Sequence, residues 1–292
     1  PPGDPTPTGS PAPPGDATPT GSTAPRNATP PRDTAPARDA TPAKDPACPA
    51  PLDVRPSPLG ASSRRESVGS GGLELVRGIS AFQRNTAPLV RGELARLARE
   101  GQRPTQLFLT CADSRLVTSM ITSSGPGDLF VVRNVGNLVP PPGEESGDDS
   151  VAAAIEYAVD VLAVRSITVC GHSGCGAMQA LLGSETSGAR TPLRRWLRHG
   201  LPSLERMGDK GASRPGLAGR APADAVEELC LANVVQQLEH LRAHESVARA
   251  LKDGRLEVHG LYFHVGEAQT YLLTETDREP VFERVRAVDL VV

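Results

Sequence analysis

The sequence is poor in aromatic residues, and the shortage is greatest at one end. Only 3% of the 292 residues are Phe, Trp or Tyr, and none occurs before Phe82. The same stretch is rich in proline, since 18 of the 29 prolines precede residue 60. A segment with so little apolar surface cannot offset the entropy lost on ordering. We therefore expect residues 1–72 to form a disordered Pro/Ala/Thr-rich linker or tail and residues 73–292 to form the folded domain.

Other missing features exclude several classes of protein. No run of 18 or more apolar residues is present, which argues against a membrane-spanning helix. The formal net charge of -3 gives no electrostatic reason to expect nucleic acid as a partner. The N-terminus lacks the charged, apolar and small-residue order of a secretory signal. Five cysteines without the spacing of a disulfide framework favour a reducing cytoplasm as the location.

From residue 73 onward, two kinds of apolar pattern alternate. Short apolar runs predict buried strands, and apolar residues three or four positions apart predict helices. The predicted strands are 106–110, 129–132, 166–170 and 256–265, with 271–274 as a hairpin partner of the last. The predicted helices are 73–84, 89–100, 150–164 and 223–243, and 183–220 is expected to be a surface excursion. This alternation favours an α/β fold with a parallel sheet covered by helices.

Two short segments carry residues suited to chemistry, and each directly follows a predicted strand. They are Cys111-Ala112-Asp113-Ser114-Arg115 and Gly171-His172-Ser173-Gly174-Cys175-Gly176. Ligand sites of open α/β sheets gather at the carboxyl ends of the strands. Cys111, His172 and Cys175 supply two thiolates and an imidazole, a set that binds catalytic zinc and leaves a fourth position open. The sequence therefore predicts one Zn²⁺ per chain.

Asp113 and Arg115 add a charged pair to this site. Residues two apart in an extended segment point to the same side, so both can face the metal together with Cys111. The Asp113 carboxylate can take the fourth coordination position itself. It can instead pair with the guanidinium fork of Arg115 and leave that position to water. Both arrangements remain open from the residues alone.

The remaining cysteines and two histidines have simpler interpretations. Cys170 ends a predicted strand and Cys230 lies in an apolar helix, so both are expected to be buried core residues. His240 and His244 are four residues apart on a predicted helix, a spacing that can bind metal. No further ligand is evident near them, and we expect them to lie on an exposed polar face.

Four segments together resemble a known family. CADSR (111–115), FVVRNVGNLVP (130–140), AAIEYAV (153–159) and GHSGCG (171–176) are similar, in this order, to the signature of the β-class carbonic anhydrases. The resemblance covers about residues 75–275. It implies a parallel four-stranded α/β core with an extra strand, assembled as a homodimer or tetramer. It also implies zinc-dependent reversible hydration of carbon dioxide to bicarbonate and a proton by zinc-bound hydroxide.

The resemblance also implies roles for individual residues. Cys111, His172 and Cys175 become the zinc ligands, and Asp113 and Arg115 become the catalytic dyad. The substrate-binding residues that it implies are Gln102, Phe130 and Tyr157, with Gln102 contributed by the partner subunit. Two regions depart from the family pattern. Residues 1–72 lie outside the family core, and residues 261–264 lack its usual Tyr-Asp pair.

Two other functions remain open from the sequence. The same scaffold, metal and hydroxide can serve a carbonyl sulfide or carbon disulfide hydrolase, which differs in the shape of its pocket. The chain can also be an inactive zinc-stabilised module that serves a partner through its N-terminal arm. Because the chain begins without Met on a long linker, we expect a processed chain or a fragment. The arm is then a possible tether to a bacterial membrane transporter, which would place the domain at the inner face of the membrane.

Overall fold

The computed structural model describes residues 71–143, 149–183, 191–209, 214–275 and 280–286. The predicted disordered arm, which was also expected to act as a tether, lies outside the described residues apart from Gly71 and Gly72. These two residues begin the first helix. Among the described residues, no helix has the length and apolar character needed to cross a membrane.

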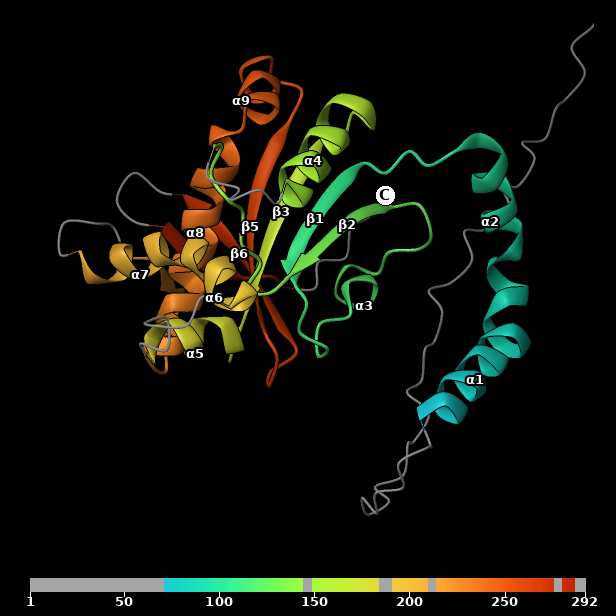
Figure 1. The fold of residues 1–292 in the computed structure, drawn as a ribbon, viewed down its shortest axis with the longest axis horizontal. Helices are drawn as coiled ribbons and strands as arrows, with labels where there is room; N and C mark the ends of the chain where they lie inside the picture. The colour runs from blue at the N-terminus through green and yellow to red at the C-terminus, as the bar shows by residue number, and fades with distance from the viewer. Residues whose placement is uncertain (1–70, 144–148, 184–190, 210–213, 276–279, 287–292) are drawn as a thin grey trace, which may run out of the picture. The chain divides into compact units, whose positions relative to one another are not determined.

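A seven-stranded sheet forms the centre of the described fold (Figure 1). The strand order is β2-β1-β3-β5-β6-β7-β4, in which the first four strands are parallel. β6 pairs antiparallel with both β5 and β7, and β4 pairs parallel with β7. The strands are β1 (Gln106–Cys111), β2 (Leu129–Asn134), β3 (Ser166–His172), β4 (Gly216–Leu217), β5 (Glu257–His264), β6 (Gln269–Glu275) and β7 (Pro280–Arg284).

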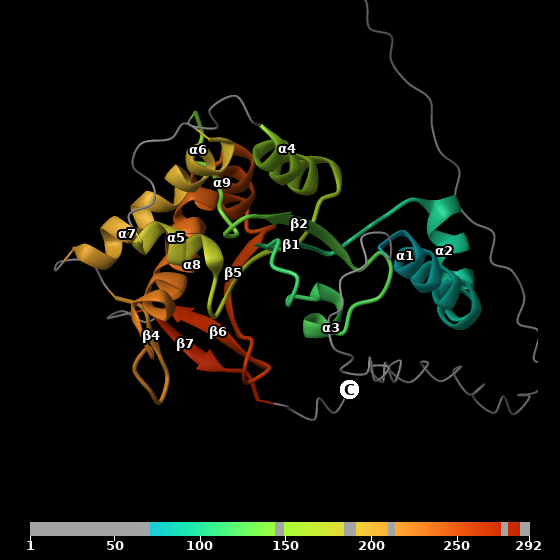
Figure 2. The same ribbon diagram turned by 60° about the horizontal axis from the view of Figure 1, so that its bottom comes forward.

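Helices of three kinds connect and cover the strands. The α-helices are α1 (Gly71–Ala81), α2 (Ala87–Glu100), α3 (Thr118–Thr122), α4 (Ser150–Glu156), α5 (Gly176–Leu182), α6 (Pro192–Leu197), α7 (Leu201–Gly208), α8 (Ala225–Ala243) and α9 (Glu245–Lys252). Two π-helical turns, η1 (Phe82–Thr86) and η2 (Tyr157–Val161), and one 3₁₀ turn, η3 (Arg198–Gly200), complete them. Figure 2 shows α5, α7 and α8 grouped together beside β5.

β1 and β3 are buried on both faces, which explains why their sequences are continuous apolar runs. All but the first residue of β1 and of β3 is buried. Parallel strands need helices on both faces, so they do not alternate between apolar and polar residues. α8 packs against β3 and β5. Gly171 makes this approach possible, because a Cβ atom there would lie 2.6 Å from Cγ2 of Val234 on α8.

The predicted strands and the four predicted helices are all found, but two helices end differently. The helix predicted over 150–164 becomes π-helical at Tyr157, and Ala163 then adopts the left-handed conformation with φ 53°. The helix predicted over 73–84 likewise becomes π-helical at Phe82. π-helical turns inside α-helices often occur at functional sites.

Two expectations about the second half of the chain are wrong. Residues 191–209 of the predicted surface excursion form α6, η3 and α7, which bury Leu197 and Ser203. His240 and His244 are only 8% and 7% exposed. α8 is buried on most of its surface, including several polar side chains, so an amphipathic pattern does not describe it.

A buried carboxylate joins the start of α8 to β5. Glu227 accepts hydrogen bonds from both Nη atoms of Arg220 at 2.6 and 2.7 Å. It also accepts from the backbone N–H of Ala223 at 2.6 Å and from the Tyr262 hydroxyl at 2.8 Å. The Arg220 hydrogen bonds, aided by the other two donors, lower the pKa of Glu227 to about 2. The network holds α8 against the strand that neighbours β3.

Replacing this carboxylate should weaken the fold in a pH-dependent way. Because the folded pKa of about 2 lies below the unfolded value of about 4.3, ionised Glu227 stabilises the fold above pH about 4.3. This stability is lost as the pH falls through about 2. Glu227→Gln should lower the free energy of unfolding at pH 7 by about 1.5–3 kcal/mol. Urea denaturation at neutral and acidic pH measures both effects.

Glu228→Gln is the matched control, because Glu228 pairs with the exposed Arg214 at 3.2 Å. Exposed pairs contribute about 0–1 kcal/mol. Two results would contradict this assignment. One is an equal loss of unfolding free energy in the two variants, and the other is a loss in Glu227→Gln that grows as the pH falls.

Candidate metal centre

Two parallel strands and one helix bring three ligand atoms together. Cys111 ends β1, His172 ends β3, and Cys175 precedes the first turn of α5. The two sulfurs and an imidazole nitrogen all lie within 4.8 Å of one another, and all three residues are buried. The predicted ligand set is therefore brought together by the fold, from positions 61 residues apart in the chain.

The imidazole of His172 is oriented toward this cluster. Its Nδ1 lies 3.0 Å from the carbonyl oxygen of Ser173, so Nδ1 carries the hydrogen and donates it. Nε2 then presents its lone pair, and this buried atom has no hydrogen-bond partner among the described residues. A buried polar atom without a partner is costly, whereas a metal ion at this position would satisfy it.

The two thiols influence each other strongly. The neighbouring Cys175 thiol, followed by His172 and the Gly136 N–H, lowers the pKa of Cys111 to about 4. The Cys111 sulfur and burial in turn raise the pKa of Cys175. Two thiolates can be charged side by side in this buried place only with a cation between them. The donor set, the free Nε2 and the closeness of the sulfurs therefore fit Zn²⁺.

Asp113 lies beside the ligands and is paired with Arg115. Its Oδ1 accepts from Arg115 Nε at 2.9 Å, and its Oδ2 accepts from Nη2 at 2.7 Å. Nη2 also donates to the Gly174 carbonyl at 3.0 Å, which fixes the guanidinium on the α5 side. These hydrogen bonds hold the pKa of Asp113 well below its usual range. Asp113 Oδ2 is still 3.9 Å from His172 Nε2, so the carboxylate borders the metal position.

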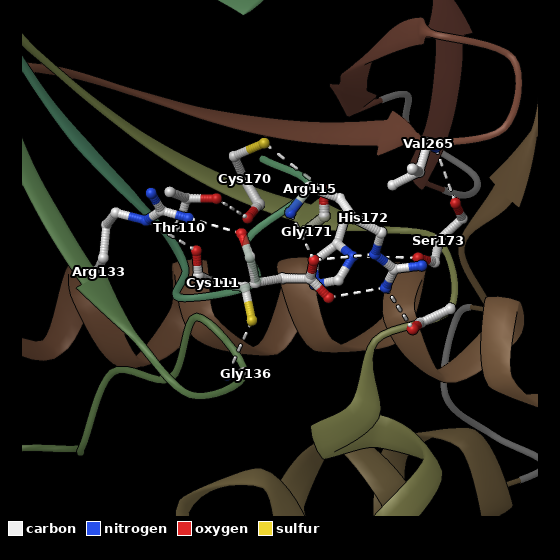
Figure 3. A network of polar contacts seen from close by, with 12 residues as sticks. Thr110, Cys111, Arg115, Arg133, Gly136, Cys170, Gly171, His172, Ser173 and Val265 are labelled. Atoms are coloured by element: carbon white, nitrogen blue, oxygen red, sulfur yellow. Dashed lines mark hydrogen bonds and ion pairs between the residues drawn. The ribbon is translucent and has the colours of Figure 1, made fainter. Parts of the chain in front are cut away.

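Two further residues support the ligands, and sequence reasoning assigned them no role. Arg133 donates to the carbonyl oxygens of Cys111 at 3.2 Å and Asp113 at 2.7 Å (Figure 3). The Gly136 N–H donates to the Cys111 sulfur at 3.4 Å. Both lie within the segment 130–140 that carried the family resemblance. The sequence feature that could have identified Arg133 is its charge near the end of the otherwise apolar strand β2.

Of the predicted substrate-binding residues, Phe130 lines a groove and Tyr157 lies against Phe130. The Phe130 and Tyr157 rings are 5.8 Å apart between centroids. Phe130 lines a groove of about 500 Å³ that follows β2 and is closed on one side by Trp196. The groove extends to Asn134, which is the register partner of Cys111. The groove therefore ends beside the strand that carries Cys111, and the three ligand residues are not part of its lining.

Gln102 is not brought to the metal centre within one chain. It is exposed and precedes β1, whereas Cys111 lies at the opposite end of that strand. The prediction that the partner subunit supplies this residue therefore stays a prediction.

Comparisons with known proteins agree with the geometry. Residues 106–270 match the family model described as carbonic anhydrase. The chain is 39% identical over 192 residues to a carbonic anhydrase of Pseudomonas aeruginosa, covering 66% of this chain and 83% of that protein.

Solved structures of the β-class also match the fold. The β-carbonic anhydrase CcaA superposes with a TM-score of 0.65 at 31% identity, covering 75% of this chain and 94% of that one. A tetrameric β-carbonic anhydrase of Sordaria macrospora gives 0.54 at 27% identity, covering 69% and 95%. With the family model spanning most of β1 to β6 and the ligand triad at the strand ends, the chain belongs to the β-class carbonic anhydrases.

Proposed function

We propose that the chain catalyses the reversible hydration of carbon dioxide to bicarbonate and a proton, with one zinc ion held by Cys111, His172 and Cys175. The observation that supports this most is the three-ligand cluster with a fourth side left open, because Arg115 engages both oxygens of Asp113. Zinc bound by three protein ligands supplies a hydroxide nucleophile at neutral pH.

The side chains around the cluster have complementary tasks in this proposal. Asp113 is ionised and can only accept hydrogen bonds, so it orients the attacking oxygen by accepting its hydrogen. Arg115 keeps the carboxylate in place and away from the metal. Phe130 would form an apolar wall for the apolar substrate, carbon dioxide. Gln102 of the partner subunit would donate to an oxygen of the bicarbonate-like transition state.

A second copy of the chain is the proposed partner. Among residues 72–100, which span α1, η1 and α2, only Ala87 is buried. Large apolar side chains are instead exposed there: Leu73, Leu75, Val76, Ile79, Phe82, Leu89 and Leu94. The edge strand β2 exposes Val131, and η2 exposes Tyr157 and Val161. Apolar surface of this extent is typical of an interface, and the Sordaria relative is tetrameric.

Carbon dioxide hydration should depend on the bound metal. Stopped-flow measurements on protein with a known zinc content should show activity that rises with pH between about 6.5 and 9. Chelation should abolish this activity, and added Zn²⁺ should restore it. Cys175→Ser should lose both zinc and activity, since it removes one of three ligands. Cys170→Ser is the matched control, because the Cys170 thiol lies near the site and donates to the Gly171 carbonyl, but is not one of the three clustered ligands.

A zinc-loaded chain without carbon dioxide hydration at any pH would contradict the proposal. Assays with carbonyl sulfide and carbon disulfide on the same preparation would then separate the hydrolase from the inactive module.

Loss of Arg115 should reduce turnover without removing the metal. Arg115→Ala frees Asp113 to approach the metal position, so kcat should fall about 10- to 100-fold while zinc content stays at one per chain. Arg249→Ala is the matched control. The Arg249 side chain is about as exposed as that of Arg115, and it donates to both carboxylate oxygens of Asp160. This pair is remote from the metal ligands. Loss of zinc from Arg115→Ala would mean that Arg115 has a structural role.

The contribution of the partner subunit can be tested by complementation. Gln102→Ala and Cys175→Ser chains should each be inactive alone. When they are co-expressed, a mixed dimer combines an intact metal site with the partner's Gln102, and about a quarter of the wild-type sites should be restored. A mixture that stays inactive while mixed dimers form would place Gln102 outside the partner's site.

A further inference from the structure

One face of α8 carries a line of buried polar side chains that no catalytic role uses. Asn233, Gln237, His240 and His244 follow one another at intervals of four, three and four residues. This spacing aligns them along the end of α8 and the residue that follows it. All four are more than nine-tenths buried, although burial of polar groups is costly unless they are hydrogen-bonded. We call them the α8 polar stripe.

Every member of the stripe bonds to the same loop, residues 136–140. Asn233 Nδ2 donates to the Gly136 carbonyl at 3.0 Å, and Gln237 Oε1 accepts from the Val139 N–H at 2.7 Å. His240 Nδ1 lies 2.9 Å from the Val139 carbonyl, and His244 Nε2 lies 3.0 Å from the Pro140 carbonyl. The stripe thus holds the loop's backbone at Gly136, Val139 and Pro140.

The direction of the His240 bond is fixed by a chain of donors. Arg206 Nε donates to Gln236 Oε1 at 3.0 Å, so the Gln236 amide points its NH₂ group toward His240. Gln236 Nε2 then donates to His240 Nε2 at 3.0 Å. With Nε2 accepting this bond, His240 carries its hydrogen on Nδ1, where it donates to the Val139 carbonyl. This chain of hydrogen bonds orients the Nδ1–H donor of His240 toward the loop.

The loop itself adopts a demanding conformation. Gly136 and Asn137 are both left-handed, with φ of 86° and 47°. A Cβ atom at Gly136 would lie 2.9 Å from the Cβ of Ala177 on α5. The Asn134 side chain accepts from the Leu138 N–H and donates to the Leu138 carbonyl, each at 2.8 Å. Because consecutive left-handed residues are unfavourable, external bonds are needed to keep this shape.

The loop has one contact with the metal centre. The N–H of Gly136, whose carbonyl is held by Asn233, donates to the Cys111 sulfur at 3.4 Å. A hydrogen bond to a ligand sulfur withdraws charge from the metal–sulfur bond and restricts movement of the ligand. The carbonyl and the N–H of one residue share the local backbone, so a shift of the loop alters this contact.

We infer that the α8 polar stripe positions the Gly136 N–H on the Cys111 sulfur and so sets how much charge this ligand gives to the metal. The stripe residues are positioning residues, since none of them contacts a ligand atom. This inference rests on the proposed zinc site. It gives a role to buried polar side chains that close packing of the core does not require.

Cobalt substitution tests the inference, because absorption from sulfur to Co²⁺ reports thiolate charge independently of carbon dioxide hydration. Asn233→Leu removes the bond to the Gly136 carbonyl, together with the bonds that Asn233 accepts from Ser203 and Gln237, and leaves a side chain of similar volume. His244→Leu removes the most distant bond. Leu241→Ala is the control, since it removes a buried side chain from the same helix without removing a bond to the loop. Each protein is loaded with Co²⁺, and the zinc dissociation rate is measured in parallel.

Asn233→Leu should move the sulfur-to-cobalt band to lower energy, because a sulfur without its hydrogen bond releases charge more readily. Zinc should dissociate about 10-fold faster from this variant. His244→Leu should show a smaller shift in the same direction, and Leu241→Ala should show none. Thermal unfolding of each loaded protein establishes that it is folded.

Three results would overturn the inference. One is an unchanged band in folded Asn233→Leu, and another is an equal shift in Leu241→Ala. A wild-type protein without sulfur-to-cobalt absorption would overturn the metal centre as well. A wild-type protein with the band but without carbon dioxide hydration would contradict only the proposed reaction, and the variants would still decide the role of the stripe.

Discussion

The structure around the site depends on one constraint, which is that two buried sulfurs and an imidazole need a cation between them. The ligand atoms of Cys111, His172 and Cys175 all lie within 4.8 Å of one another, and both cysteines are buried and free of disulfides. Without a cation, the closeness of the sulfurs raises the pKa of Cys175 and keeps a proton there. Metal binding and local stability are therefore coupled.

The parallel sheet makes this arrangement possible. β1 and β3 are neighbours in register, so their carboxyl ends deliver Cys111 and His172 to one edge. α5 begins there with Cys175, and α8 approaches β3 closely at Gly171. The bonds that orient the ligands come from backbone groups, such as the Ser173 carbonyl and the Gly136 N–H. The scaffold thus supplies geometry, while the metal would supply the charge.

The sequence predicted the strands and the ligand triad, because apolar runs and strand-end motifs are local signals. It did not predict the burial of His240 and His244 or the π-helical turn at Tyr157. A polar residue on a helix is assigned to solvent unless its partner is known, and the partner here is a loop about 100 residues earlier. The role of Arg133 was missed for the same reason, since it acts on the backbone of Cys111 at the end of another strand and of Asp113 beyond it.

X-ray absorption at the zinc edge of the purified protein tests the central claim most directly. The account predicts two sulfur ligands at about 2.3 Å and nitrogen or oxygen ligands at about 2.0 Å, with four in total. Cys111→Ser should reduce the sulfur count to one or abolish binding. A shell of three or four sulfurs would bring Cys170 or Cys230 into the site. A shell without sulfur would place the metal elsewhere, and either result would contradict the account.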